Sequence, residues 1–215
     1  MITPVADVPE RFNAAAFFVD RHLAEGRGGR AVFRYRGRRV TYAELAERVN
    51  RFGNALLDLG VEIENRVLLI LPDCPEFAEA FWGAIKIGAV PVPVNPWLKS
   101  ADYAFLLEDS RAKVVVAGAE AATQVISLGD QCRSLRNVVV VGDRGANALG
   151  YEELLARAST SLEPADTSRD DVALWGYTSG STGKPKAAVH LQRDLLFAAD
   201  LVGWQIFGIA PDDLV

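Results

Sequence analysis

The sequence has few of the residues on which metal centres and disulfide frameworks depend. Only two cysteines, Cys74 and Cys132, and two histidines, His22 and His190, occur among 215 residues. The cysteines have neither the spacing of a zinc site nor the number that a disulfide-stapled secreted domain needs. We therefore expect both thiols to be small buried residues in a reduced, cytoplasmic protein.

The sequence also lacks a long apolar run and an excess of positive charge. No stretch approaches the roughly 20 apolar residues that a membrane-spanning helix needs. Residues 1–10 carry acids and prolines in place of the basic patch and apolar block of a signal peptide. A formal net charge of −5 gives no general attraction to nucleic acid. We expect neither a membrane nor a nucleic acid among its partners.

Half of the residues are hydrophobic, and they alternate between short apolar runs and helical patterns. The predicted strands are 66–71, 89–94, 113–117 and 137–141. Helical patterns lie at 42–59, 75–87, 100–108 and 151–158, with a further helix between the third and fourth strands. The first run shows no polar alternation, which is typical of a strand buried on both faces. The pattern predicts an α/β fold with a mainly parallel sheet and helices on both faces.

Local signals mark several element boundaries. Thr41 and Glu44 form a capping box ahead of an apolar helical face. Two prolines interrupt the run 89–94, so that strand is expected to be irregular or to lie at a sheet edge. Ser100 is expected to cap the following helix.

A polar segment at 159–171 divides the sequence and is the strongest linker candidate. We predict an N-terminal α/β subdomain at 1–170 and the start of a second subdomain at 171–215. The second part holds another apolar helical face, formed by Leu195, Ala199, Val202 and Ile206. Its last two residues, Leu214-Val215, are typical of a strand that is just beginning, so we expect a fragment of a longer polypeptide.

The stretch 177–186, Tyr-Thr-Ser-Gly-Ser-Thr-Gly-Lys-Pro-Lys, carries the clearest functional signal. Apolar runs at 172–175 and 187–189 place it between two predicted strands. Glycines let backbone N–H groups point inward, Ser and Thr hydroxyls donate hydrogen bonds, and lysines add positive charge. The composition favours a phosphate-binding loop over the alternative, an ordinary surface turn.

Two well-known motifs do not fit this loop. The pattern G-x-x-x-x-G-K-[ST] of phosphate-loop NTPases fails because Thr178 replaces its first glycine and Pro185 replaces its final hydroxyl residue. The hydrolase pattern G-x-S-x-G has Thr178 at its centre, and only a short stretch follows His190 to supply the other catalytic groups.

Three stretches together resemble the adenylate-forming enzymes, which include acyl- and aryl-CoA synthetases, luciferases and peptide-synthetase adenylation domains. The loop resembles their phosphate-binding signature, and residues 40–45 and 85–95 resemble their first and second core motifs. The three occur in the same order over most of the chain. The benzoate-CoA ligases are the most similar group at 13–20, 48–56 and 80–86. One departure is Ala187, where the family usually has glycine.

The resemblance implies two half-reactions. A carboxylate attacks the α-phosphate of ATP to give an acyl-adenylate and pyrophosphate, and the thiolate of CoA then forms the thioester. ATP, Mg²⁺, CoA and a small carboxylic acid, aromatic in this group, are the implied ligands. Donors around the phosphates would lower the first barrier electrostatically. The implied phosphate-binding residues are Thr178, Ser179, Gly180, Ser181, Thr182, Gly183, Lys184 and Lys186.

The resemblance also implies an incomplete site. The family's adenine motif, acid pocket, magnesium ligand and C-terminal lysine lie beyond Val215, so no catalytic residue or metal ligand is assigned here. We expect this chain to be the N-terminal part of the large domain, inactive alone, with the rest of its own polypeptide as a partner. A fatty-acyl or medium-chain ligase, or a non-catalytic nucleotide-binding module, remains an alternative.

Overall fold

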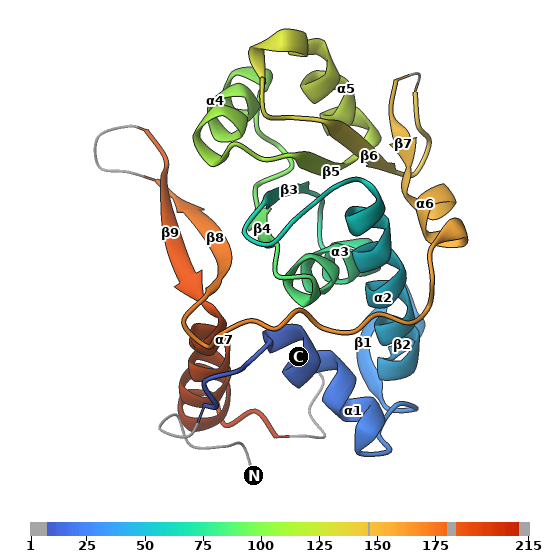
Figure 1. Ribbon diagram of the computed structural model, residues 1–215, viewed down its shortest axis with the longest axis vertical. Coiled ribbons are helices and arrows are strands. Elements are labelled where there is room, and N and C mark those ends of the chain that lie inside the picture. Colours follow the sequence, from blue (N-terminus) through green and yellow to red (C-terminus); the bar gives the residue numbers. More distant parts are fainter. Residues whose placement is uncertain (1–7, 146, 180–183, 211–215) are drawn as a thin grey trace.

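A five-stranded parallel sheet forms the centre of the computed structural model, which describes residues 8–145, 147–179 and 184–210 (Figure 1). The strand order is β4-β3-β5-β6-β7, and Leu68 of β3 lies opposite Val92 of β4 and Val115 of β5. This confirms the predicted α/β fold with a mainly parallel sheet, and β4 lies at the predicted edge. The strands are β3 (Arg66–Ile70), β4 (Val90–Pro93), β5 (Val114–Gly118), β6 (Asn137–Val141) and β7 (Leu149–Gly150).

Helices cover both faces of this sheet, as predicted. Alternate side chains of a strand point to opposite faces. Leu69 therefore packs against α2 (Tyr42–Asp58), α3 (Pro75–Lys86) and α6 (Tyr151–Arg157). Leu68, its neighbour, packs on the other face. That face is covered by α4 (Ser100–Ser110) and α5 (Ala119–Ser127), which a short 3₁₀ turn, η3 (Gly129–Gln131), follows.

The ends of two helices show which local signals were sufficient. Thr41 caps α2 and exchanges hydrogen bonds with Glu44, so the predicted capping box is present. The prediction that Ser100 caps α4 is wrong, because Lys99 occupies the N-cap position. Asp102 accepts the Lys99 backbone N–H at 3.2 Å, and the Ser100 hydroxyl instead lies 3.1 Å from Gln124 Oε1 of α5.

The N-terminal part packs below the sheet in Figure 1. Its helical segment comprises η2 (Ala16–Asp20) and α1 (Arg21–Ala24), and a hairpin of β1 (Ala31–Tyr35) and β2 (Arg38–Thr41) follows. Lys86 of α3 is 2 % exposed and pairs with Asp20 at 2.7 Å. Its ammonium group also donates to Asn50 at 2.6 Å, so one buried cation joins η2, α2 and α3.

Residues 159–171 form an extended segment that runs along α2 and α3 (Figure 1). Asn54 of α2 donates to the carbonyls of Ser159 and Ser161, each at 2.9 Å. Further along, the Ala165 N–H donates to the Lys86 carbonyl at 2.8 Å. The predicted linker is therefore a long connection that hydrogen bonds from side chains and backbone hold to the surface.

The last elements are β8 (Val172–Thr178), β9 (Lys186–Leu191), α7 (Gln192–Ala198) and η4 (Ala199–Ile206). The apolar face predicted for the helix that runs through α7 and η4 is wrong. Leu196, outside that face, is buried, whereas Val202 and Ile206 of the predicted face are 41 % and 65 % exposed. From Ala199 the chain has π-helical geometry, and Leu201, Trp204 and Phe207 are exposed there as well, so the described residues cover no apolar face of this segment. Within the described ranges, no helix combines the length and apolar composition that crossing a membrane requires.

Candidate functional site

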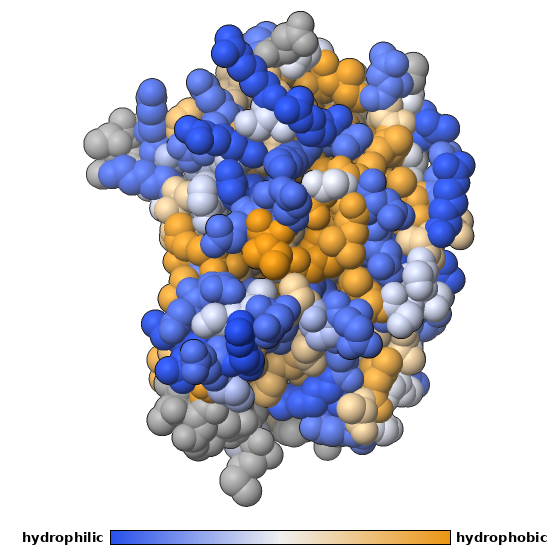
Figure 2. All heavy atoms as spheres, viewed as in Figure 1, coloured by the Kyte–Doolittle hydropathy of each residue, from blue (hydrophilic) through white to orange (hydrophobic). Residues whose placement is uncertain are grey.

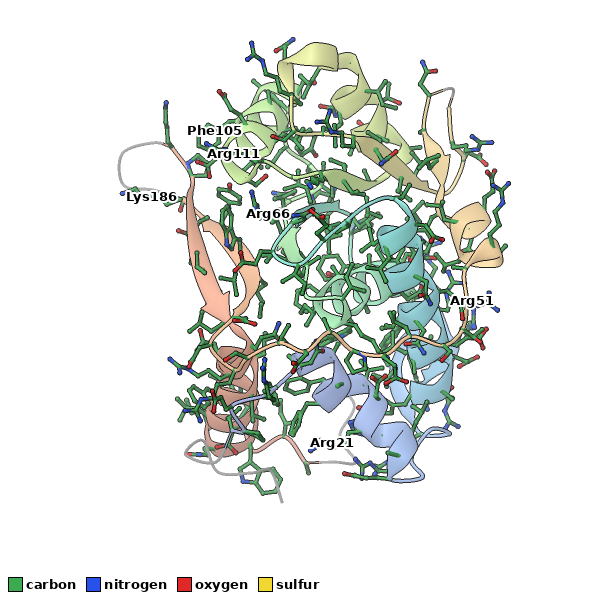
Figure 3. The ribbon with its side chains drawn as sticks, viewed as in Figure 1. Arg21, Arg51, Arg66, Phe105, Arg111 and Lys186 are labelled. Atoms are coloured by element: carbon green, nitrogen blue, oxygen red, sulfur yellow. The ribbon has the colours of Figure 1, made fainter. Side chains whose placement is uncertain are left out.

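The predicted loop lies at the end of an antiparallel hairpin formed by β8 and β9. Thr178 is opposite Lys186, and its hydroxyl donates to the Lys186 carbonyl at 3.4 Å. The loop therefore begins and ends at neighbouring positions, with a strand on each side as predicted. Figure 3 places Lys186 at the outer end of this hairpin, and Figure 2 shows mostly hydrophilic atoms there.

The described part of the loop presents polar groups to solvent. Thr178, Ser179, Lys184 and Lys186 are all exposed. Neither ammonium group has an acidic partner within 4.0 Å in the part of the chain that the structure describes. The predicted residues Gly180, Ser181, Thr182 and Gly183 lie outside the described residues. The exposed hydroxyls and lysines are chemically suited to an anionic ligand.

Ala187 replaces a glycine that the resembling family usually carries, and its backbone geometry is ordinary. It lies in β9 opposite Tyr177. It is not among the described non-glycine residues with positive φ, which are Arg36, Glu64, Arg111 and Asn147. A methyl group at this position therefore imposes no left-handed backbone strain on the strand.

The hairpin contacts helix α4 through residues that sequence patterns did not reveal. The Tyr177 hydroxyl donates to Asp109 Oδ2 at 2.5 Å. The Lys184 ammonium lies 6.0 Å from the centroid of the Phe105 ring. Burial, followed by the hydrogen bond to Asp109, raises the pKa of Tyr177 above its ordinary value, so its hydroxyl stays protonated as a donor.

The two histidines have different environments. His190 is exposed on β9, opposite Leu174. His22 stacks on Tyr42 with ring centroids 3.8 Å apart, and its Nδ1 accepts from Arg27. Partial burial, followed by the positive charges of Arg27 and Arg21, lowers the pKa of His22 to about 4. A neutral, stacked imidazole at this position has a structural role.

The cysteines are free, as expected, but only Cys132 is buried, whereas Cys74 is half-buried just before α3. Burial raises the pKa of the Cys74 thiol to about 12. The thiol is therefore protonated at neutral pH, which does not favour nucleophilic chemistry.

A second polar cluster joins α2, α3 and α6 beside a cavity of about 270 Å³. Glu79 is 3 % exposed and pairs with Arg48 at 2.7 Å, and Tyr151 donates to it at 3.0 Å. Arg48 also bonds Glu152 at 2.5 Å. Burial raises the pKa of Glu79, while the Arg48 charge opposes the rise. Glu79 and Glu152 thus both pair with Arg48, and this network links the three helices.

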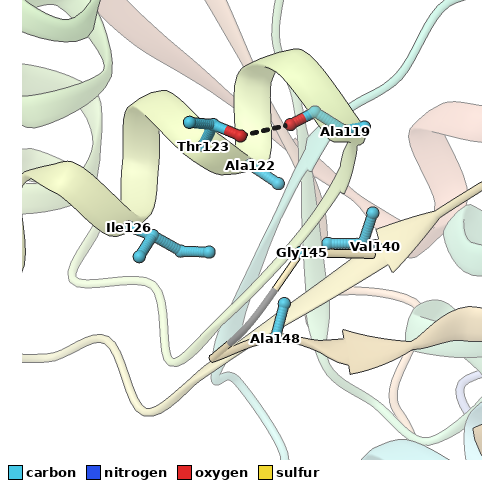
Figure 4. Close-up of a pocket in the computed structure, with 7 residues that line it drawn as sticks. All are labelled: Ala119, Ala122, Thr123, Ile126, Val140, Gly145 and Ala148. Carbon is cyan, nitrogen blue, oxygen red and sulfur yellow. Dashed lines mark hydrogen bonds between the residues drawn. The ribbon is translucent and has the colours of Figure 1, made fainter. Parts of the chain in front are cut away.

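A smaller cavity of about 230 Å³ lies beside α5 (Figure 4). Thr123 is the one polar residue described in its lining, and its hydroxyl donates to the Ala119 carbonyl at 2.9 Å. The lining therefore offers a polar ligand no free side-chain donor. Among the described residues, no group of three His, Cys, Asp or Glu side chains is placed to hold a metal ion. The exposed hairpin remains the best-supported site.

Comparisons with known proteins show the family to which the chain belongs. The chain is 43 % identical over 204 residues to a 4-hydroxybenzoate-CoA/benzoate-CoA ligase of Rhodopseudomonas palustris, covering 95 % of this chain and 38 % of that protein. It is 41 % identical over 213 residues to a benzoate-CoA ligase of Thauera aromatica, covering 99 % of this chain and 40 % of that protein. The chain thus spans about 40 % of the length of these relatives.

Solved structures give the same picture. The structure of an anthranilate CoA ligase in complex with anthranoyl-AMP superposes with a TM-score of 0.90 at 30 % identity, covering 96 % of this chain and 40 % of that one. A benzoate CoA ligase from Burkholderia xenovorans LB400 gives 0.81 at 35 % identity, covering 94 % and 39 %. The "AMP-binding enzyme" family matches residues 20–215. The resemblance seen in the three sequence motifs is confirmed, and the chain belongs to the AMP-binding enzyme family.

Proposed function

We propose that this chain is the N-terminal part of an ATP-dependent aryl-CoA ligase of the benzoate type. The polypeptide would form an acyl-adenylate from ATP and an aromatic carboxylic acid, and then an acyl-CoA thioester. The observation that carries the proposal is the set of exposed loop residues Thr178, Ser179, Lys184 and Lys186 at the end of the β8–β9 hairpin of an AMP-binding family member. The names of its relatives favour benzoate and hydroxybenzoates over fatty acids.

The loop would bind the β- and γ-phosphates of ATP. Thr178 and Ser179 supply hydroxyl donors, and Lys184, with Lys186 second, supplies positive charge where negative charge builds during adenylation. Gly180, Ser181, Thr182 and Gly183 belong to the same proposal on sequence grounds. Mg²⁺ would shield the phosphates, but the described residues hold no carboxylate cluster suited to it, so we assign it no ligand and no step.

The division of the chain follows the same proposal. Residues 1–170 would form the N-terminal α/β subdomain, and residues 171–215 would begin the next one with the phosphate-binding loop. In support, β8 and β9 form a two-stranded sheet separate from the five-stranded sheet. CoA and the aromatic acid would bind with residues supplied by the rest of the polypeptide. The net charge of −5 and the free thiols support a cytoplasmic protein that does not bind nucleic acid.

The test is ATP–pyrophosphate exchange with the polypeptide as the cell makes it, including any residues encoded after Val215. We expect exchange with benzoate and 4-hydroxybenzoate to exceed exchange with octanoate, and no exchange from residues 1–215 alone. A preference for octanoate would favour the fatty-acid alternative. ATP binding without exchange for any acid would support the non-catalytic module instead.

A further inference from the structure

Helix α4 contacts the loop hairpin on both sides of the loop. Tyr177, at the end of β8, bonds Asp109 at 2.5 Å, and Lys184, just after the undescribed residues, lies 6.0 Å from the Phe105 ring. Phe105 and Asp109 are four residues apart, so they lie on the same side of the helix, one turn from each other. Figure 3 shows Phe105 beside the outer end of the hairpin.

The middle of the hairpin is also linked to this helix. The Arg66 guanidinium lies 5.4 Å from the centroid of the Trp175 ring on β8. The same side chain donates from Nε to the carbonyl of Ser110, the last residue of α4, at 2.6 Å. The helix therefore meets the hairpin directly at Phe105 and Asp109, and at its C-terminal end through Arg66.

These side-chain contacts matter because the hairpin has no backbone ladder to the main sheet. β8 packs beside β4, yet the two belong to separate sheets. Pro91 and Pro93 lack the N–H groups through which β4 would extend the ladder. An isolated two-stranded hairpin is at best marginally stable in water. The position of the loop therefore depends on the contacts that the side chains of the hairpin make with neighbouring elements.

We propose that α4 holds the loop in position, and that Asp109 and Phe105 are positioning residues for the phosphates of ATP. This inference rests on the proposed function. The Asp109 hydrogen bond fixes the end of β8, from which Thr178 and Ser179 project. Phe105 keeps the Lys184 ammonium beside the loop through a cation–π contact. At 6.0 Å this contact is at the limit of the effective range, so a bound phosphate can draw the lysine away.

The first measurement tests whether α4 holds the hairpin in position, and it needs no nucleotide. Backbone hydrogen exchange is followed at residues 178–188 in the unmodified chain and in Asp109→Ala, Tyr177→Phe and Asp109→Asn. The control is Glu108→Ala, which removes an exposed carboxylate from the neighbouring position of the same helix. We expect faster exchange in the first two variants, near-normal exchange in Asp109→Asn because its amide oxygen still accepts, and no change in the control. Unchanged hydrogen exchange in Asp109→Ala would contradict the proposal that α4 holds the loop in position.

The second measurement is the KM for ATP and for benzoate in the complete polypeptide carrying the same substitutions and Phe105→Leu. Losing a hydrogen bond to an exposed charged group is expected to raise the KM for ATP about fivefold in Asp109→Ala. We expect a smaller rise in Phe105→Leu, and no change in the KM for benzoate or in the Glu108→Ala control. Faster exchange with an unchanged KM for ATP would overturn the positioning role. If the unmodified polypeptide binds no ATP, the proposed function fails. The hydrogen-exchange data then still decide whether α4 holds the loop in position.

Discussion

The parallel sheet and the loop hairpin are stabilised in different ways. Residues 67–70 of β3 are fully buried, whereas most of β9 is exposed. Burial of apolar surface stabilises the sheet strongly and without directed contacts. Because the core is closely packed, a substitution that removes side-chain volume there is costly. The hairpin packs beside β4 and adds a few directed contacts, among them those to α4. The scaffold is therefore set by hydrophobic packing, and the geometry of the candidate site by single hydrogen bonds and ring contacts.

The largest predicted effect contrasts the two regions directly. Leu69→Ala in β3 leaves a cavity between the sheet and its helices and is expected to lower the free energy of unfolding by about 3 kcal/mol. Val189→Ala in β9, where the side chain is 50 % exposed, should cost less than about 0.5 kcal/mol. Urea titration followed by circular dichroism measures both. Equal losses in the two variants would show that the hairpin is part of the cooperative core.

A second prediction concerns the polar network beside the sheet. Arg48→Met leaves the buried Glu79 carboxylate without its cation and should cost about 3 kcal/mol at pH 7.5. Burial already raises the pKa of Glu79 above its unfolded value, so the folded protein favours the protonated acid. Stability lost by the variant should therefore return as the pH falls toward 4.5 and Glu79 becomes neutral.

The comparison of unfolding curves at pH 7.5 and 4.5 in Arg48→Met and the unmodified chain measures this effect. Glu47→Gln, an exposed carboxylate on the same helix, serves as a control for general charge effects. A destabilisation that grows on acidification would contradict the role assigned to Glu79.

A smaller effect is expected at His22, outside the sheet. Its folded-state pKa of about 4 lies below its ordinary value of 6.5, so the unfolded chain takes up the proton first as the pH falls. The stacked, neutral His22 therefore contributes stability above pH 6.5 that is lost between pH 6.5 and about 4. Because the ring is partly exposed, we expect about 1 kcal/mol of pH-dependent stability. His22→Gln should remove that part of the pH dependence in urea titrations, and an identical profile in both proteins would contradict it.

The smallest effect is expected at Ala187. Because its backbone is extended and its φ is not positive, Ala187→Gly relieves no strain and only adds freedom to the unfolded chain. The substitution should lower the free energy of unfolding by about 0.5 kcal/mol and leave the KM for ATP unchanged. A gain in stability, or a lower KM, would show that the methyl group tightens the loop.

Sequence patterns predicted the features that depend on neighbouring residues. The Thr41–Glu44 capping box and the buried strand predicted at 66–71 follow from short-range chemistry and hydrophobic patterning, and both are present, the strand at Arg66–Ile70. Ser100 was misassigned because its hydroxyl has a tertiary partner, Gln124, which the local pattern does not contain. The burial expected for the face of the last helix was wrong because burial depends on which other segments cover a helix, and an apolar spacing does not contain that information.

The candidate site was predicted in part for the same reason. Its loop was recognised from contiguous residues, whose polar composition and flanking strands carry the signal. Asp109 lies 68 residues from Tyr177 and had no feature that distinguished it from other exposed acids. Contacts between distant segments follow from the fold, so the contacts of α4 with the hairpin could be found only in the three-dimensional structure.

The central claim is that the loop binds the phosphates of ATP, and Lys184 tests it most directly. The measurement is the KM for ATP in Lys184→Ala of the complete polypeptide, compared with Lys113→Ala, which removes a lysine just before β5 that pairs with Glu62. We predict a rise of about tenfold or more in Lys184→Ala, as expected for the loss of a charge-assisted contact, and a change below about twofold in Lys113→Ala. The same small change in both variants would contradict the assignment of this loop to the nucleotide.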